Sequence, residues 1–83
     1  MKVGIAGSLE SNDCLISVSE APSLSIEIKS IVDAFFHDQI EKVIKDTLKE
    51  KKIDKVKVDC QDKGALDYTI RARLVTALER MGK

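Results

Sequence analysis

Aromatic residues, proline, histidine and cysteine are all scarce in this chain of 83 residues. It contains two Phe, one Tyr, no Trp, one Pro, one His and two Cys. One histidine and two cysteines far apart in sequence leave a zinc site short of ligands, and two cysteines do not make a disulfide framework. We therefore expect both cysteines to be reduced and buried as small apolar side chains.

An excess of charge of either sign is also missing. The 14 Lys and Arg residues balance the 14 Asp and Glu residues, so no overall field favours a nucleic-acid partner. The lysines within residues 49–57 alternate with other residues, which predicts a solvated helix end and strand face. No apolar run is long enough to cross a bilayer, and the N-terminal residues lack the apolar core of a secretion signal. We expect a cytoplasmic chain without a membrane partner.

What the chain does contain predicts a folded protein. Hydrophobic residues make up 43% and charged residues 34% of the sequence, which is typical of globular proteins. A chain of this length builds one core, and neither a repeat nor a linker divides it. We expect a single domain over residues 1–83.

Alternating apolar residues predict strands in three regions. Residues 3–18 resemble a β-hairpin with ESND, residues 10–13, at its tip, and the alternation places Cys14 on the core-facing side. Residues 23–30 and 53–62 show the same period of two, which predicts a third and a fourth strand.

Two further segments follow the helical period. We expect helices over about residues 31–52 and 65–81. Their expected apolar stripes are Phe36, Ile40, Val43, Ile44, Thr47 and Leu48 in the first and Leu66, Ile70, Leu74, Ala77, Leu78 and Met81 in the second. Asp62 is expected to be the N-cap of the second helix, and Asp67 to lie at its positive end.

This order of elements, β-β-β-α-β-α, predicts an α+β fold. The simplest packing places both helices on the apolar face of one small four-stranded sheet. The third strand, the first helix and the fourth strand would form a right-handed crossover if the two strands are parallel neighbours. The order of the strands in the sheet does not follow from the sequence.

Candidates for catalytic chemistry are few. His37 lies beside Asp38 toward the polar side of the first helix, which predicts a surface histidine. Cys14 is close to a turn, but Glu10 and Asp13 are expected to raise its pKa, and a core position is favoured over a nucleophilic one. The glycines have neither Rossmann nor P-loop spacing. The residues alone therefore predict a small binding or carrier module with no catalytic or metal-binding residues.

Two motifs closely resemble the acyl carrier protein of citrate lyase, its gamma subunit. They are GSLESNDCLI at residues 7–16 and DKGALDYTIRARLVTALER at residues 62–80, and the resemblance covers nearly the whole chain. The family has GTLESGD or similar before its second strand, and DDKGALD followed by RARLEAAL in its last helix. Residues 62–67 and 71–74 match the second motif. Asn12 stands where the family often has glycine, and we expect the turn to survive because Asn tolerates left-handed backbone geometry.

The resemblance implies a covalent cofactor. This cofactor is 2'-(5''-phosphoribosyl)-3'-dephospho-coenzyme A, joined by a phosphodiester to the serine of the LES motif, which maps to Ser11. Its thiol would carry acetyl and then citryl while citrate is cleaved to oxaloacetate and acetate, so the chain would be a non-catalytic subunit of a lyase. The implied partners are the alpha (acyl transferase) and beta (citryl lyase) subunits, the prosthetic-group transferase and an acetylating ligase.

Other interpretations remain open from the residues. A serine in ESND is, by itself, more often only a turn residue. The chain could also serve a related lyase, such as one acting on citramalate, or be a stand-alone protein-interaction module. Asp62, Lys63, Arg71 and Arg73 are candidates for a docking surface, although a structural role is favoured for Asp62.

Overall fold

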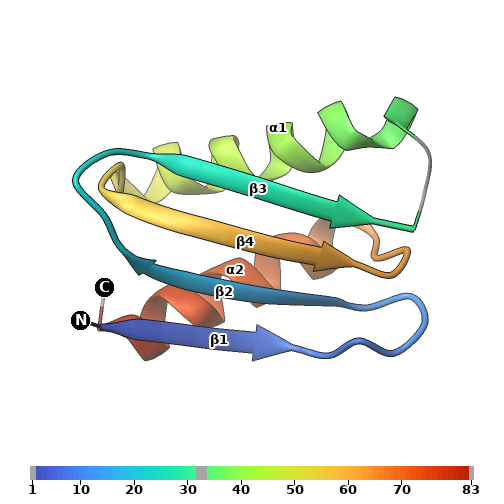
Figure 1. Cartoon of the computed structure of the whole chain (residues 1–83), viewed down its shortest axis with the longest axis horizontal. Helices are drawn as coiled ribbons and strands as arrows, with labels where there is room; N and C mark the ends of the chain where they lie inside the picture. Colours follow the sequence, from blue (N-terminus) through green and yellow to red (C-terminus); the bar gives the residue numbers. More distant parts are fainter. Residues whose placement is uncertain (1, 32–33, 83) are drawn as a thin grey trace.

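One four-stranded sheet with two helices on one face makes up the fold (Figure 1). This computed structural model describes residues 2–31 and 34–82. The elements are β1 (Val3–Gly7), β2 (Cys14–Glu20), β3 (Ser25–Ser30), α1 (Ala34–Lys51), β4 (Val56–Asp62) and α2 (Asp67–Met81). The predicted fold class and element order are confirmed. The expected beginning of the first helix includes residues 32–33, which lie outside the described residues.

The strands lie in the order β1-β2-β4-β3. β2 pairs antiparallel with β1 and β4, whereas β3 pairs parallel with β4. The third and fourth strands are therefore parallel neighbours, as the predicted crossover requires. β1 and β2 form the predicted hairpin, and its loop lies at the same end of the sheet as the connection from β4 to α2 (Figure 1).

The core lies between the inward face of the sheet and the apolar stripes of the helices. α2 packs against β1 and β2, while α1 packs against β3 and α2. The period of two in the strands and of 3.6 in the helices brings these side chains to one side. The buried apolar residues are Ala6, Cys14, Ile16, Val18, Val56, Val58 and Cys60 from the sheet, and Ile40, Ile44, Leu48, Ile70, Leu74, Ala77, Leu78 and Met81 from the helices.

The predicted burial is wrong for two residues of the helical stripes. Phe36 and Leu66 are 49% and 58% exposed. Leu66 is the N-cap of α2 and has extended backbone angles, φ −75 and ψ 160, so its side chain departs from the helical stripe. Phe36 lies in the first turn of α1 and lines a groove facing the beginning of α2. Both residues lie where the helices begin, beyond the buried stripe that the two helices share.

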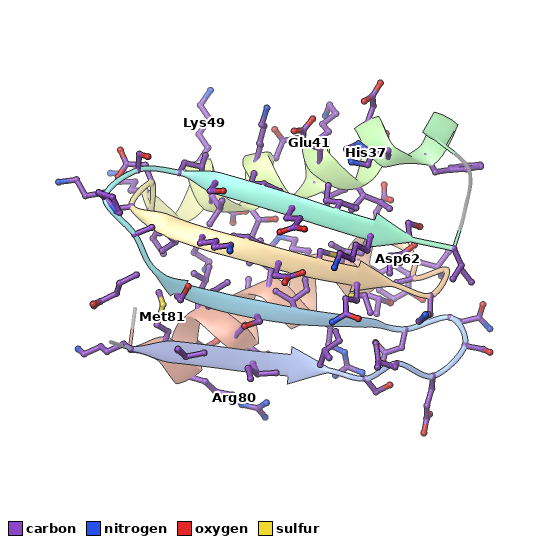
Figure 2. All side chains as sticks on the ribbon, viewed as in Figure 1. His37, Glu41, Lys49, Asp62, Arg80 and Met81 are labelled. Carbon is purple, nitrogen blue, oxygen red and sulfur yellow. The ribbon has the colours of Figure 1, made fainter. Side chains whose placement is uncertain are left out.

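The prediction that Asp62 caps the second helix is also wrong. α2 begins at Asp67, and no side chain caps it. Asp62 instead lies at the end of β4 (Figure 2), where it is 2% exposed. Its Oδ1 accepts from the backbone N–H of Ala65 at 2.9 Å, and its Oδ2 accepts from the Ser30 hydroxyl at 2.8 Å. The favoured structural role is confirmed, because Asp62 fixes the loop before α2 to the end of β3.

The surface has two further features that bear on the sequence predictions. The lysines within residues 49–57 are exposed, as expected for a solvated helix end and strand face. Over residues 2–31 and 34–82, neither helix is long and apolar enough to span a membrane.

Candidate functional site

Ser11 lies at the turn of the β1–β2 loop, residues 8–13, and is exposed to solvent. Its hydroxyl has no hydrogen-bond partner among the residues that the structure describes. Asn12, the next residue, has φ 66, which is the left-handed conformation that Asn tolerates. The expectation that the turn survives with Asn in place of Gly is therefore confirmed.

Backbone hydrogen bonds hold this exposed loop in place. Its two ends are joined by the N–H of Ser8, which donates to the carbonyl of Cys14 at 3.1 Å. The N–H of Asn12 donates to the carbonyl of Lys63 at 2.8 Å, and the N–H of Lys63 donates to the carbonyl of Asp13 at 2.8 Å. The loop that carries Ser11 is thus tied to the loop between β4 and α2, and these are the two segments in which the family motifs lie.

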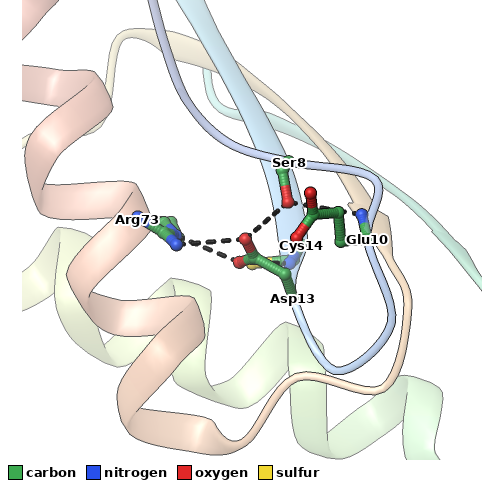
Figure 3. A network of polar contacts seen from close by, with 5 residues as sticks. All are labelled: Ser8, Glu10, Asp13, Cys14 and Arg73. Carbon is green, nitrogen blue, oxygen red and sulfur yellow. Dashed lines mark hydrogen bonds and ion pairs between the residues drawn. The ribbon is translucent and has the colours of Figure 1, made fainter.

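A partly buried network of hydrogen bonds around Asp13 ties the same loop to α2 (Figure 3). The Nε and Nη2 atoms of Arg73 donate to the two carboxylate oxygens of Asp13, each at 3.0 Å. The Ser8 hydroxyl and the backbone N–H of Cys14 also donate to this carboxylate, each at 2.7 Å. The Ser8 hydroxyl accepts from the backbone N–H of Glu10 at 3.3 Å. Charge-assisted bidentate pairs of this kind fix geometry well.

These donors change the acidity of Asp13. The hydrogen bonds from Arg73, from the Ser8 hydroxyl and from the Cys14 backbone lower the pKa of Asp13 from 3.8 to about 2. Asp13 is therefore ionised at neutral pH, and its charge is balanced by Arg73. Glu10, which directly precedes Ser11, forms no ion pair within the described part of the chain.

Asp13→Asn is expected to reveal the contribution of this network through pH. Because the pKa of Asp13 is lower in the folded chain than the unfolded value of 3.8, its contribution to stability is fully present above pH 3.8 and is lost as the pH falls through about 2. We expect the variant to be less stable by about 1 kcal/mol at neutral pH, allowing for solvent screening around the half-exposed Arg73. Urea unfolding at a series of pH values measures the difference between the two proteins.

Glu50→Gln is the matched control, because Glu50 also receives two hydrogen bonds from an arginine. Arg71 Nη2 lies 2.7 Å and 2.8 Å from the two Glu50 oxygens, joining α2 to α1. Both side chains of this pair are about half exposed, so the control should lose less stability. A wild type that keeps a constant advantage over Asp13→Asn down to about pH 2 would show that the Asp13 network does not hold the loop.

The two arginines of the motif therefore both pair within the chain. Arg73 holds the Ser11 loop, and Arg71 joins the helices. Neither is a merely solvated side chain, and the sequence could not indicate their partners because Asp13 and Arg73 are 60 residues apart. A docking role for these residues stays a prediction.

The two cysteines are buried and are free thiols, as expected. Antiparallel pairing places Ile16 opposite Cys60 and Cys14 opposite Asp62, so the two cysteines are diagonal neighbours on the inward face of the sheet. The hydrogen bond between their thiols lowers the pKa of Cys14 and, together with burial, raises that of Cys60. The expected rise in the pKa of Cys14 is therefore wrong in direction, because the Cys60 thiol outweighs the carboxylates. Complete burial still removes Cys14 as a nucleophile.

The remaining candidate, His37, is on the surface of α1 as predicted (Figure 2). One helical turn brings a nitrogen of His37 and carboxylate oxygens of Asp38 and Glu41 to within 4.8 Å of one another. This cluster was not predicted from the sequence, although the i, i+4 spacing of His37 and Glu41 could have indicated it. Asp38 is 96% exposed, and exposed acidic groups are common without a metal ion.

Comparison with known proteins gives consistent matches. The family described as acyl carrier protein, malonate decarboxylase delta subunit (MdcD), matches residues 1–81. A citrate lyase acyl carrier protein of Halothermothrix orenii is 44% identical over 79 residues, covering 94% of this chain and 84% of the relative. Another, of Streptococcus mutans, is 42% identical over 81 residues, covering 95% of this chain and 79% of the relative.

A solved structure supports the fold. One chain of a Pseudomonas malonate decarboxylase hetero-tetramer in complex with malonate superposes with a TM-score of 0.85. The match covers 98% of this chain and 84% of the other, with 19% sequence identity. At that identity the likeness shows a common fold.

Proposed function

We propose, from the premise that this chain belongs to the citrate lyase acyl carrier protein family, that the Ser11 hydroxyl carries the prosthetic group through a phosphodiester. The observation that supports this most directly is the position of Ser11. Its hydroxyl is exposed and has no partner among the described residues, while the backbone on either side is tied to Cys14 and Lys63. An exposed hydroxyl on a fixed loop is what a modifying enzyme and a long flexible arm both require.

The chain is an acyl carrier, and acyl carriers of this family hold their cargo on a covalently attached group. The finer assignment is 2'-(5''-phosphoribosyl)-3'-dephospho-coenzyme A on Ser11. When attached, it supplies a terminal thiol that holds acetyl and citryl as thioesters. The residues of the chain supply the attachment oxygen, the rigid support from Asp13 and Arg73, and a tether that raises the local concentration of the thioester at each partner site.

We propose that the chain itself contributes no catalytic group. Both of its thiols are completely buried, and His37 lies on the surface of α1. The partners would be an alpha subunit that transfers the acyl group, a beta subunit that cleaves the citryl thioester, the prosthetic-group transferase and an acetylating ligase. A carrier of a related lyase acting on citramalate is the alternative in the same class, because a carrier meets the acid only through its thioester.

Mass spectrometry of the carrier, co-expressed with the prosthetic-group transferase and precursor synthase, tests the attachment. We expect the intact mass to rise by that of the phosphodiester-linked group, and the added mass to be found on the peptide that contains Ser11. Ser11→Ala should gain no mass. An unmodified wild type, with the modifying enzymes active on a known carrier, would instead favour a stand-alone protein-interaction module.

A further inference from the structure

A groove of about 840 Å³ lies between the beginnings of α1 and α2. Its walls are mainly apolar and include Phe36, Leu66 and Tyr68. These three side chains are 49%, 58% and 71% exposed, in a protein whose other helical apolar residues are mostly in the core. Large exposed apolar side chains around a hollow commonly mark a binding site, and the volume suits a small organic group.

The groove continues toward the Ser11 loop. A smaller pocket of about 180 Å³ shares Phe36 and Asp67 with the groove and reaches Gly64. A Cβ built on Gly64 would lie 3.6 Å from Oδ1 of Asn12, so a lining residue of this pocket lies beside the residue that follows Ser11. A group attached to Ser11 therefore starts at the same end of the sheet as the groove (Figure 1).

The polar groups of the groove indicate which part of an attached arm it suits. Asp38 and Asp67 contribute two carboxylates, and the one ammonium group, Lys42, is 3.0 Å from Asp46 outside the groove lining. Phosphates would be repelled there. An uncharged chain with amide groups would instead find apolar walls and the Gln39 amide, which donates to Asp67 at 2.7 Å.

We propose that this groove holds the uncharged pantetheine end of the arm, together with its acetyl thioester, while the phosphates stay near the loop. This inference rests on the proposed attachment to Ser11. It gives the groove a function between transfer steps, because a thioester lying against Leu66 and Tyr68 is less open to hydrolysis by water than one on a free arm.

Tyr68 makes the groove directly observable, since it is the one tyrosine of the chain and there is no tryptophan. We expect attachment of the arm to change the tyrosine fluorescence and to shift the backbone amide resonances of residues 64–68, in a comparison of modified and unmodified carrier. Intact mass measured on the same samples establishes that the arm is present.

Alkylation of the arm thiol by iodoacetamide tests the contact itself, since Cys14 and Cys60 are buried and should not react. We expect the thiol to react roughly fivefold faster in modified Leu66→Ser than in modified wild type, because the variant loses apolar contact with the arm. Ile5→Ser is the matched control. Ile5 is 51% exposed on β1, outside the groove, and its replacement should leave the rate unchanged.

The outcomes separate this inference from the function on which it rests. A carrier that bears the group on Ser11 but shows the same amide resonances, the same fluorescence and the same alkylation rate in all variants would overturn the inference alone. A carrier that never acquires the group would overturn both.

Discussion

A carrier in which Ser11 is replaced by alanine is expected to lower citrate cleavage by the assembled complex at least about a thousandfold. The loop should keep its shape, because the Ser11 hydroxyl makes no hydrogen bond to a described residue and the fixed positions are those of its neighbours. The loss would follow from the missing attachment oxygen alone. Without it no thiol is tethered, and the thioester must reach each partner site by free diffusion.

Reconstitution with purified partner subunits measures this effect as oxaloacetate released from citrate. Ser23→Ala is the matched control, because Ser23 is also exposed and lies in the turn between β2 and β3, at the opposite end of the sheet (Figure 1). Its activity should equal that of the wild type. Full activity of Ser11→Ala, with circular dichroism showing both variants folded, would move the attachment to another residue.

The elements of the fold could be predicted because their periods are regular. Val56, Val58 and Cys60 alternate with charged or polar residues and are all buried. The strand order could not be predicted in the same way. A period of two defines which face of β4 is buried, but it does not say which strands lie beside β4, and in the structure both β2 and β3 do.

Ser11 could be predicted from the sequence, whereas the contacts that surround it could not. Ser11 came from a family motif, because a serine in a polar turn is by itself ordinary. The network that holds it depends on Asp13 and Arg73, and the contact between Cys14 and Cys60 depends on the pairing of β2 with β4. Contacts between such distant residues exist only after the chain has folded.

The errors also have a common cause. Phe36 and Leu66 continue an apolar pattern past the point at which the helices face each other, so periodicity overestimates their burial. The position of Asp62 before an apolar run predicts a helix cap. The chain uses residues 63–66 to reach the Ser11 loop before α2 begins, so the carboxylate fixes that connection instead.

Gly4 is a further position whose role could not be predicted from the sequence, because that role depends on contact with the backbone of α2. Gly4 lies in β1 opposite Val18 and is buried beneath α2. A Cβ at this position would lie 1.8 Å from the carbonyl oxygen of Ala77 and 2.7 Å from the backbone nitrogen of Met81. A glycine inside a strand can mark such an approach of another backbone.

Gly4→Ala is therefore expected to destabilise the fold by about 3 kcal/mol. The overlapping atoms belong to the backbone of α2, so relief requires the helix to move away from β1 and to open the core around Leu74 and Leu78. Urea unfolding followed by circular dichroism measures the loss, and a variant that fails to fold would agree with it.

Val3→Ala provides the control in the same strand, because Val3 is 49% exposed. Its free energy of unfolding should change by no more than about 0.5 kcal/mol. A Gly4→Ala variant with the unfolding midpoint of the wild type would mean that α2 does not lie directly on β1. The Ser11 loop would then lose its support as well, since α2 is the helix that carries Arg73 to Asp13.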